Sequence, residues 1–242
     1  MGSVRYQIEV AATLEIATPV GIGRLHVAPA RNPKAVLALG HGARAGIDAP
    51  DLVTLAEQLP PSGVTVVRFE QPWLAAGRDA AGPARDLDSA WRAALAELPV
   101  LWPGVPVFAG GRSLGARVAC RCFDGGQRGL VLTSFPILDR HHPADNSRIV
   151  ELAKVASDAY LFQIADDPYG PAARIRAELA EHGAQLAQFV VAPGNRHHID
   201  TKAAQGRVSR HVAKLVSSVR SFIDDRAYAH PSLGERVLVA YQ

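Results

Sequence analysis

Cysteine is scarce in this sequence: Cys120 and Cys122 are the only two in 242 residues. Both fall in an expected helix, where residues two apart point to different faces, so neither a disulfide nor a shared metal ion is expected. Buried thiols in a reducing compartment are the simplest interpretation. His141, His142 and Asp145 form another potential metal cluster, but they lack a third histidine or carboxylate at ligand spacing, which favours a solvated loop. We expect no metal.

Long apolar runs and basic clusters are also missing. The first nine residues contain no apolar core of signal-peptide length. No run approaches the ~18 residues that a membrane helix needs. The 26 lysines and arginines nearly balance the 23 acidic residues, and they are interspersed with them rather than grouped with aromatics. We therefore expect a cytoplasmic protein with neither a membrane nor a nucleic acid as partner.

What the chain does have is enough apolar sequence for one sizeable core. Hydrophobic residues make up 48% of it, and its length suits a single α/β domain. From residue 35 onward, apolar strand-like segments alternate with helical ones, which predicts a doubly wound, mostly parallel sheet with helices on both faces. Expected strands cover 35–39, 64–69, 105–109, 129–134, 160–164 and 186–191. Expected helices cover 48–59, 87–98, the segment after residue 113, 148–155, 173–181 and 208–223.

The two ends of the chain differ from this pattern. Apolar and polar residues alternate from Tyr6 to Ile16, and a shorter strand is expected over 22–27. Together they predict an antiparallel hairpin at a sheet edge. The domain is expected to span residues 1–225, followed by a C-terminal extension over 226–242. Its segment 237–240 either docks as a strand on the body or on a second copy in a homodimer, or belongs to a mobile tail.

One stretch, residues 107–119, has the pattern of a strand, a sharp turn and a helix, with Ser113 at the turn. Gly111 and Gly115 flank the serine in the Gly-x-Ser-x-Gly spacing of a nucleophile elbow. Side chains at these two positions would collide with the neighbouring strand and helix, and the strained turn exposes the serine hydroxyl. The five-residue pattern also fits an ordinary glycine-rich turn, so the other residues at the same sheet edge decide its meaning.

A serine nucleophile needs a general base, which is itself oriented by a third group. Ligands of doubly wound sheets bind at the carboxyl ends of the strands, and the candidate partners of Ser113 all follow expected strands. The chain order serine, aspartate, histidine is the one this architecture uses. We predict Asp167 as the acid and His197 as the base. Asp166 and His198 are the adjacent alternatives.

These motifs carry a family resemblance. The chain resembles α/β-hydrolases of the dienelactone-hydrolase-related kind, most closely a small group that includes bacterial proteins similar to testis-expressed hydrolase-like proteins. The resemblance implies an α/β-hydrolase fold without a large lid domain. It rests on segments between residue 35 and about 225: His41-Gly42-Ala43 with Asp48 and Pro50, Arg68-Phe69 with Pro72, the run from Gly110 to Arg117, Ser134-Phe135-Pro136, Gln163 with the run from Asp167 to Gly170, and His197.

The resemblance also implies roles for residues around the serine. The backbone N–H groups of Ala43 and Leu114 would form the oxyanion hole. His41, Arg44 and Arg112 are candidate substrate-binding residues; the alternatives are that His41 shapes its loop and that Arg112 is a structural hydrogen-bond donor. The implied activity is cofactor-free hydrolysis of an ester, thioester or related carboxyl bond in a small-molecule acyl substrate.

Two departures from the family pattern support a second hypothesis. Arg44 and Ile164 stand where similar proteins usually carry glycine. The alternative is therefore a catalytically inert binding or scaffold protein with the same fold. The distance between His197 Nε2 and Ser113 Oγ separates the two hypotheses, because only a hydrogen-bonded pair can activate the serine.

Overall fold

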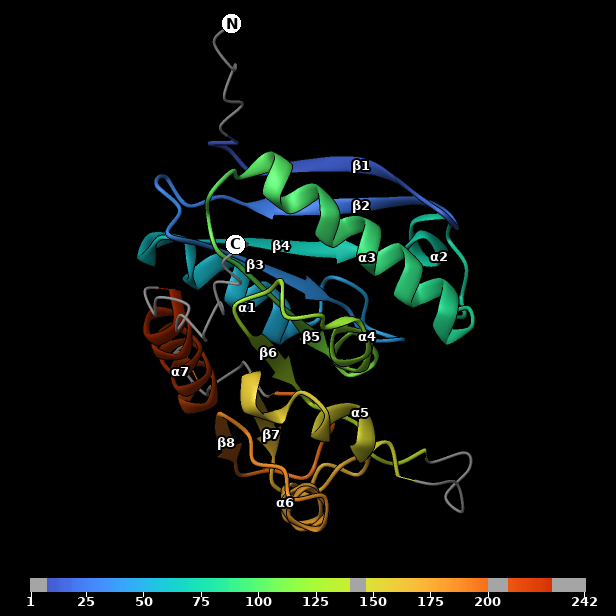
Figure 1. The fold of residues 1–242 in the computed structure, drawn as a ribbon, viewed down its shortest axis with the longest axis vertical. Coiled ribbons are helices and arrows are strands. Elements are labelled where there is room, and N and C mark those ends of the chain that lie inside the picture. Colours follow the sequence, from blue (N-terminus) through green and yellow to red (C-terminus); the bar gives the residue numbers. More distant parts are fainter. Residues whose placement is uncertain (1–7, 140–146, 200–208, 228–242) are drawn as a thin grey trace, which may run out of the picture.

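A computed structural model describes residues 8–139, 147–199 and 209–227. Its centre is an eight-stranded sheet (Figure 1). The strands are β1 (Ala12–Thr18), β2 (Gly21–Ala28), β3 (Ala35–Gly40), β4 (Val64–Glu70), β5 (Val107–Arg112), β6 (Leu130–Thr133), β7 (Ala159–Ile164) and β8 (Gln188–Ala192). Their order is β1-β2-β4-β3-β5-β6-β7-β8. β2 pairs antiparallel with β1 and β4, and all other pairs are parallel. The predicted mostly parallel sheet with an N-terminal hairpin at its edge is confirmed.

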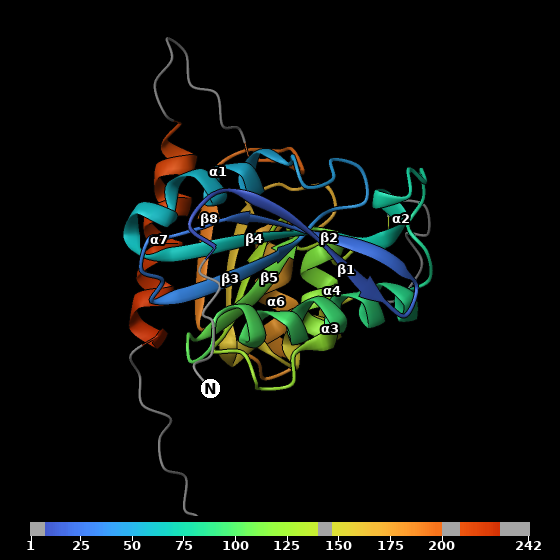
Figure 2. The same cartoon turned by 90° about the horizontal axis from the view of Figure 1, so that it is seen from above.

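Helices cover both faces of the sheet (Figure 2). On one face lie α3 (Ala84–Leu101), α4 (Leu114–Cys122), α5 (Ile149–Ala153) and α6 (Ala172–Glu181), and on the other α1 (Pro50–Gln58) and α7 (Arg210–Ala227). The buried strand β3 shows why. Val36 and Ala38 belong to the core under the first group of helices, while Leu37 and Leu39 belong to the core under the second. Because successive strand residues face opposite sides, both sides must be covered.

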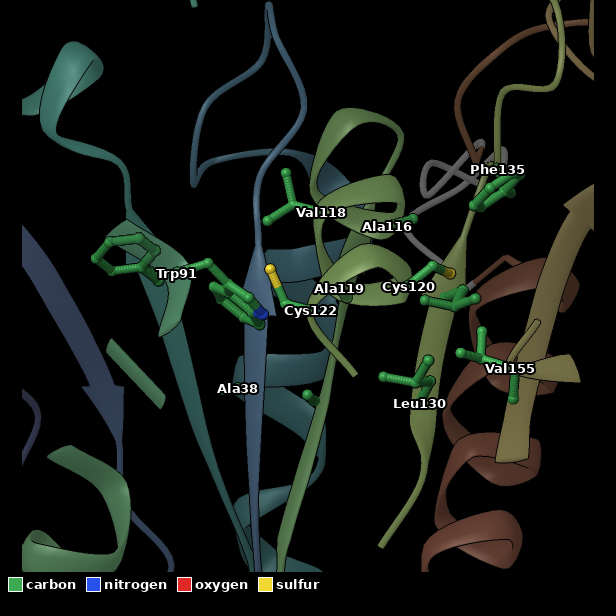
Figure 3. Close-up of a cluster of buried hydrophobic side chains, with 14 of the residues drawn as sticks. Ala38, Trp91, Ala116, Val118, Ala119, Cys120, Cys122, Leu130, Phe135 and Val155 are labelled. Carbon is green, nitrogen blue, oxygen red and sulfur yellow. The ribbon is translucent and has the colours of Figure 1, made fainter. Parts of the chain in front are cut away.

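The core between α4 and the sheet contains both cysteines (Figure 3). Cys122 points toward Trp91 of α3, whereas Cys120 points away from it, toward β6 and Leu130. Both thiols are buried and unpaired, as predicted. Burial raises the pKa of the Cys122 thiol to about 12, so it stays protonated and acts as a small apolar packing group.

The hairpin begins later than predicted. β1 starts at Ala12, not at Tyr6, because its partner strand β2 ends at Ala28 and offers no backbone groups for pairing further upstream. Val10, expected on the buried face, is 74% exposed. Tyr6 lies outside the described residues. Apolar alternation alone therefore overestimated the strand by several residues, since the length of a strand depends on its partner.

Three other boundaries also differ from the prediction. β5 starts at Val107 rather than 105, since Pro106 has no N–H to donate to the ladder, and it runs on through the two glycines expected in the turn. The segment expected as a loop through Pro83 contains the short helix α2 (Pro72–Ala75), and α3 starts directly after it at Ala84, three residues before the expected helix. α7 continues to Ala227, past the predicted end of the domain. Residues 237–240 lie outside the described residues.

Short 3-10 segments complete the connections, with η1 (Pro60–Ser62) between α1 and β4 and η2 (Ala156–Asp158) before β7. From β3 the chain adds β4 on one side, and from β5 onward it adds strands on the other side. The strand order therefore reverses between β3 and β5, which are neighbours in the centre of the sheet. In doubly wound sheets this is where the carboxyl ends of the strands leave room for a ligand. The elbow lies at the end of β5.

Candidate active site

The candidate nucleophile lies on a strained turn between β5 and α4. Ser113 has φ 52° and ψ −112°, a backbone conformation that few residues other than glycine adopt. A Cβ at Gly111 would lie 2.5 Å from the Gly40 carbonyl oxygen, and a Cβ at Gly115 would overlap the same carbonyl group. The two glycines therefore allow β3, β5 and α4 to approach closely enough to present Ser113 at the carboxyl edge of the sheet.

At this edge Ser113, His197 and Asp167 come together. Ser113 Oγ lies 2.8 Å from His197 Nε2. His197 Nδ1 lies 2.8 Å from Asp167 Oδ2 and 3.0 Å from Oδ1. A carboxylate can only accept, which assigns the proton to Nδ1 and leaves Nε2 free to accept the hydrogen of the serine hydroxyl. This is the hydrogen-bond pattern of a nucleophile, a base and an orienting carboxylate.

The carboxylate of Asp167 is fully buried and is held by its own loop and by the preceding strand β7. Its Oδ1 accepts from the Tyr169 N–H at 2.9 Å, and its Oδ2 accepts from the Gln163 amide at 3.2 Å. The Gln163 amide also donates to the Gly170 carbonyl at 2.7 Å, and its Oε1 accepts from the Phe135 N–H at 2.8 Å. Gln163 thereby ties the loop after β7 to the loop after β6. These bonds replace the water that the carboxylate loses on burial.

The neighbouring alternatives face solvent. Asp166 and His198 are exposed, whereas Asp167 is buried and His197 is partly buried. The Tyr169 ring lies against the His197 imidazole with 4.5 Å between ring centroids, which restricts the movement of the imidazole. The structure therefore brings Asp167 and His197 to the serine and leaves their two neighbours outside this hydrogen-bonded set.

The loop after β3 and the start of α4 carry the two predicted oxyanion donors. Leu114 is the first residue of α4, so its N–H has no partner within the helix. Ala43 follows Gly42, which lies next to the nucleophile: a Cβ at Gly42 would be 3.5 Å from Ser113 Cβ. Backbone N–H groups and the positive end of the α4 dipole can stabilise negative charge that develops beside Ser113.

His41 lies beneath this loop. It is 2% exposed, and its ring centroid is 5.4 Å from that of Trp73. Nε2 accepts from the Gln71 N–H at 3.1 Å, so the proton is on Nδ1, which donates to the Gly42 carbonyl at 2.8 Å. Burial lowers the pKa of His41 and keeps the imidazole neutral. His41 therefore holds the loop that carries Ala43, and the structure places it away from any surface that a substrate meets.

The two arginines predicted to contact a substrate differ in environment. Arg44 is exposed in the loop after β3, where a substrate can reach it. Arg112 is buried; its Nη2 donates to the backbone carbonyl of His197 at 2.5 Å, and its Nε lies 3.4 Å from Asp51 Oδ1. The structure thus places Arg112 in the scaffold beneath the site, the position expected of a structural donor and not of a substrate-binding group.

The part of the chain that the structure describes contains neither a cluster of metal ligands nor a membrane-spanning helix. Within residues 8–139, 147–199 and 209–227, no group of three or more histidine, cysteine, aspartate or glutamate side chains is arranged to hold a metal ion. The cluster of His141, His142 and Asp145 lies outside these ranges. No helix in the described part of the chain has the length and apolar character to cross a bilayer.

Two buried polar residues of the site were not identified from the sequence. Gln163 matched the family pattern but received no role, although a polar residue inside an apolar strand, four residues before Asp167, is a usable signal. Asp51 gives no such signal. It stands in the first turn of α1, where acidic residues commonly face the helix N-terminus, and its contacts with Arg112 and Thr133 depend on the fold.

Comparison with known proteins agrees with this architecture. A family model described as an alpha/beta hydrolase domain matches residues 33–224, which include every strand from β3 to β8. No curated protein gives a significant sequence match.

Solved structures with the same fold are numerous but distant in sequence. An alpha-beta serine hydrolase homologue from Coxiella burnetii is 17% identical, with a TM-score of 0.69 over 86% of this chain and 97% of the other. An a/b serine hydrolase without lid from Xanthomonas campestris is 17% identical, with a TM-score of 0.70 over 91% and 97%. A carboxyl esterase from Bacillus coagulans is 13% identical, with a TM-score of 0.67 over 89% and 98%. At these identities the likeness shows the fold alone.

Proposed function

Because the chain belongs to the alpha/beta hydrolase family, we propose that it is a serine hydrolase that cleaves an ester, thioester or related carboxyl bond through an acyl-enzyme. The observation that carries the proposal is the continuous hydrogen-bonded path from Ser113 Oγ through His197 to Asp167. Every group that the reaction needs belongs to this chain, so the proposed mechanism requires no cofactor.

In the acylation step, His197 Nε2 takes the hydroxyl proton while Ser113 Oγ attacks the substrate carbonyl carbon. The N–H groups of Ala43 and Leu114 stabilise the negative charge that forms on the carbonyl oxygen, and each donor contributes about 10²–10³ in rate. The imidazolium that results is stabilised by Asp167. It returns its proton to the leaving group as the bond to that group breaks, leaving an acyl-serine.

Deacylation repeats the sequence with water. His197 removes a proton from a water molecule, the hydroxide attacks the acyl carbon, and the proton passes to Ser113 Oγ as the ester bond breaks. The products are a carboxylic acid and the free enzyme. Asp167 needs only to keep the imidazole in the tautomer with Nδ1 protonated. The Gln163 and Tyr169 donors hold the Asp167 carboxylate in the position that this requires.

The proposed substrate is small or carries an exposed acyl group. In this fold a lid usually inserts between β6 and β7, and here that connection spans only residues 134–158. One structural neighbour is itself described as lacking a lid. The finer assignment to dienelactone-hydrolase-related proteins is also part of the proposal, and the motif around Ser113 supports it.

An inert scaffold with the same fold is less consistent with the geometry. A relic site has no need to retain a 2.8 Å contact between His197 and Ser113 or a fully buried, hydrogen-bonded Asp167. Arg44, one of the departures that suggested this alternative, is exposed beside the site and leaves the hydrogen-bonded path intact. Ile164 is buried at the end of β7.

An activity-based fluorophosphonate probe tests the proposal directly. We expect covalent labelling of the folded protein at Ser113 and loss of labelling in Ser113→Ala, with hydrolysis of short p-nitrophenyl esters or acyl-thioesters reduced by about 10⁶-fold. Ser134→Ala is the matched control. Ser134 also has a positive φ, 50°, at the end of a neighbouring strand, but its buried hydroxyl has no hydrogen-bond partner among the described residues.

The outcomes are distinct. Labelling that survives in Ser113→Ala, or a folded wild type that neither reacts with the probe nor turns over any acyl substrate, contradicts the proposal. Loss of labelling in Ser113→Ala, with labelling retained in Ser134→Ala, supports it.

A further inference from the structure

We propose that Arg112 and Asp51 are a positioning pair that fixes the backbone of His197 and thereby sets the distance between its imidazole and Ser113. The inference rests on the proposed serine-hydrolase function and adds two residues to it. Neither residue touches the reacting atoms. Both act through His197.

The pair begins with a carboxylate that the fold buries almost completely. Asp51 is 1% exposed, in the first turn of α1. Its Oδ2 accepts from the Thr133 hydroxyl of β6 at 2.6 Å, and its Oδ1 accepts from the Leu52 N–H at 3.1 Å. Both contacts are donors to an acceptor-only group, and the third neighbour of the carboxylate is the Arg112 guanidinium. Asp51 is therefore fixed to the sheet and to its own helix independently of its contact with Arg112.

The guanidinium of Arg112 connects three segments of the site. Arg112 directly precedes Ser113 in the chain. Its Nη2 donates to the His197 carbonyl, and its Nη1 lies under the loop after β3, 3.0 Å from where a Cβ of Gly42 would be. One buried side chain therefore contacts the loop after β8 that carries His197 (the base loop) and the loop after β3 that carries Ala43 (the oxyanion loop), while its backbone continues into Ser113.

The base loop needs such a support. In the connection that follows β8, residues 193–196 are exposed, so little packing holds the backbone there. Asp167 and the Tyr169 ring both contact the imidazole of His197, and neither of these contacts fixes its backbone. The bond from Arg112 adds a second point, on the backbone, and two separate points define the direction of the imidazole toward Ser113.

The geometry of the pair argues against a role in stability alone. Arg112 Nε is 3.4 Å from Asp51 Oδ1 but makes no hydrogen bond to any described residue. Buried ion pairs are weak contributors to stability even when their geometry is good, because both charges lose hydration. An incompletely satisfied pair beneath a reactive centre is better explained by the position that it enforces.

The test separates charge burial from positioning. The double variant Asp51→Asn/Arg112→Gln removes both charges together, which is far less disruptive than removing one. Arg112→Lys keeps a positive charge near Asp51 but lacks the planar fork that reaches two partners, and it serves as a second measurement should the double variant fail to fold. Arg121→Gln is the matched control, since Arg121 also pairs with carboxylates but lies on the far part of α4.

For the double variant we expect a wild-type-like thermal midpoint with kcat lowered about 10–100-fold, because small misplacements of a catalytic group have effects of this size. KM should change by less than about threefold, as the substrate contacts are untouched. Arg112→Lys should lie between wild type and double variant, and Arg121→Gln should keep the wild-type kcat. A folded double variant with unchanged kcat overturns the proposal, as does an equal fall of kcat in Arg121→Gln.

A readout independent of turnover distinguishes this inference from the function on which it rests. The His197 Nδ1–H proton bonded to Asp167 should give a far-downfield NMR resonance, assigned by its loss in His197→Ala. We expect it to shift or broaden in Arg112→Lys and the double variant and to persist in Arg121→Gln. If the wild type hydrolyses nothing, the proposed function fails while this resonance still decides the positioning role. An unchanged resonance in both Arg112 variants overturns it.

Discussion

Two arginine clusters lie close together in the chain. One is Arg112 with Asp51, and the other is Arg117 and Arg121 with Asp88 and Glu151. The hydrogen bonds of their guanidinium groups are satisfied to very different degrees. Arg112, just before α4, makes one ion contact at 3.4 Å and one backbone hydrogen bond, and its Nε is without a hydrogen bond to the described residues. On α4 itself, Arg121 contacts Asp88 at 2.7–3.2 Å and Glu151 at 3.2 Å. Arg117 holds the same glutamate through two bonds of 2.7 Å.

The difference follows from where the two clusters lie. The cluster on α4 joins the outer faces of α3, α4 and α5. Each of its four side chains keeps about a fifth of its surface exposed, so each is free to optimise its hydrogen-bond geometry. Arg112 must reach a carbonyl in the base loop from a backbone already constrained by the elbow. The better-made ion pairs hold helices together, and the less complete pair lies where the chemistry is proposed.

The largest effect is expected at the site. Asp167→Asn should lower kcat/KM by about 10⁴-fold, because an amide at this position favours the wrong imidazole tautomer while leaving the packing nearly unchanged. Ester hydrolysis with matched protein concentrations measures the effect. Asp166→Asn, at the exposed neighbouring position, should retain wild-type activity. If the two variants lost activity equally, Asp167 would have no special role, and the role proposed for the candidate site would be wrong.

The packing between the two clusters gives the next largest effect. Gly115→Ala should destabilise the protein by about 3 kcal/mol or more, since the new Cβ would overlap the Gly40 carbonyl, which is backbone and cannot move aside as a side chain can. Urea unfolding measures it. Gly125→Ala is the control that adds backbone strain without a collision, because Gly125 has a positive φ, unlike Gly115, and a Cβ there meets nothing within 4 Å. A loss at Gly115 no larger than the loss at Gly125 would contradict the predicted collision.

The pH dependence of stability should distinguish the candidate site, where His41 lies, from the arginine cluster on α4. The folded-state pKa of His41 lies below its unfolded value of about 6.5, so below this pH the unfolded chain binds a proton that the folded chain excludes. The contribution of neutral His41 to the unfolding free energy is complete above about pH 6.5. It is lost as the pH falls, with a slope of up to about 1.4 kcal/mol per pH unit. His41→Gln should flatten the pH dependence of the unfolding free energy between pH 7 and 5.5. An unchanged slope would contradict the assignment.

The smallest effect should come from the helix cluster. Arg121→Gln should lower the unfolding free energy by about 1 kcal/mol, as expected for partly exposed ion pairs, and leave kcat unchanged. Denaturant titrations in low and high salt measure this term and its screening. A loss of activity without a loss of stability would mean that the helix cluster also supports the site, and the contrast between the two clusters would disappear.

The sequence predicted most elements from β3 to α6, because long apolar strands and helical apolar spacing are local patterns. It overestimated β1 and missed α2. The start of β1 depends on where β2 ends, and α2 is a four-residue turn at Pro72 with too short a pattern to recognise. Boundaries of this kind are decided by partners elsewhere in the chain.

For the site, glycine spacing identified the turn at Ser113, and the order of strand ends identified the segments that carry Asp167 and His197. The sequence could not assign Arg112 to the scaffold or reveal Asp51 as its partner. Asp51 and Arg112 are 61 positions apart, and the bond from Arg112 to His197 joins residues 85 positions apart. No local pattern links such residues.

The sequence by itself determined the layered sheet and the strained turn at Ser113, since both follow from hydrophobic periodicity and from glycine at positions that admit no side chain. The sequence favoured Asp167 and His197 but left their neighbours open, and the tertiary structure decided which aspartate meets the histidine and which histidine meets the serine. It also decided that Arg112 is buried. Those outcomes depend on burial and direction at the sheet edge, which are set only when strands distant in the chain pair side by side.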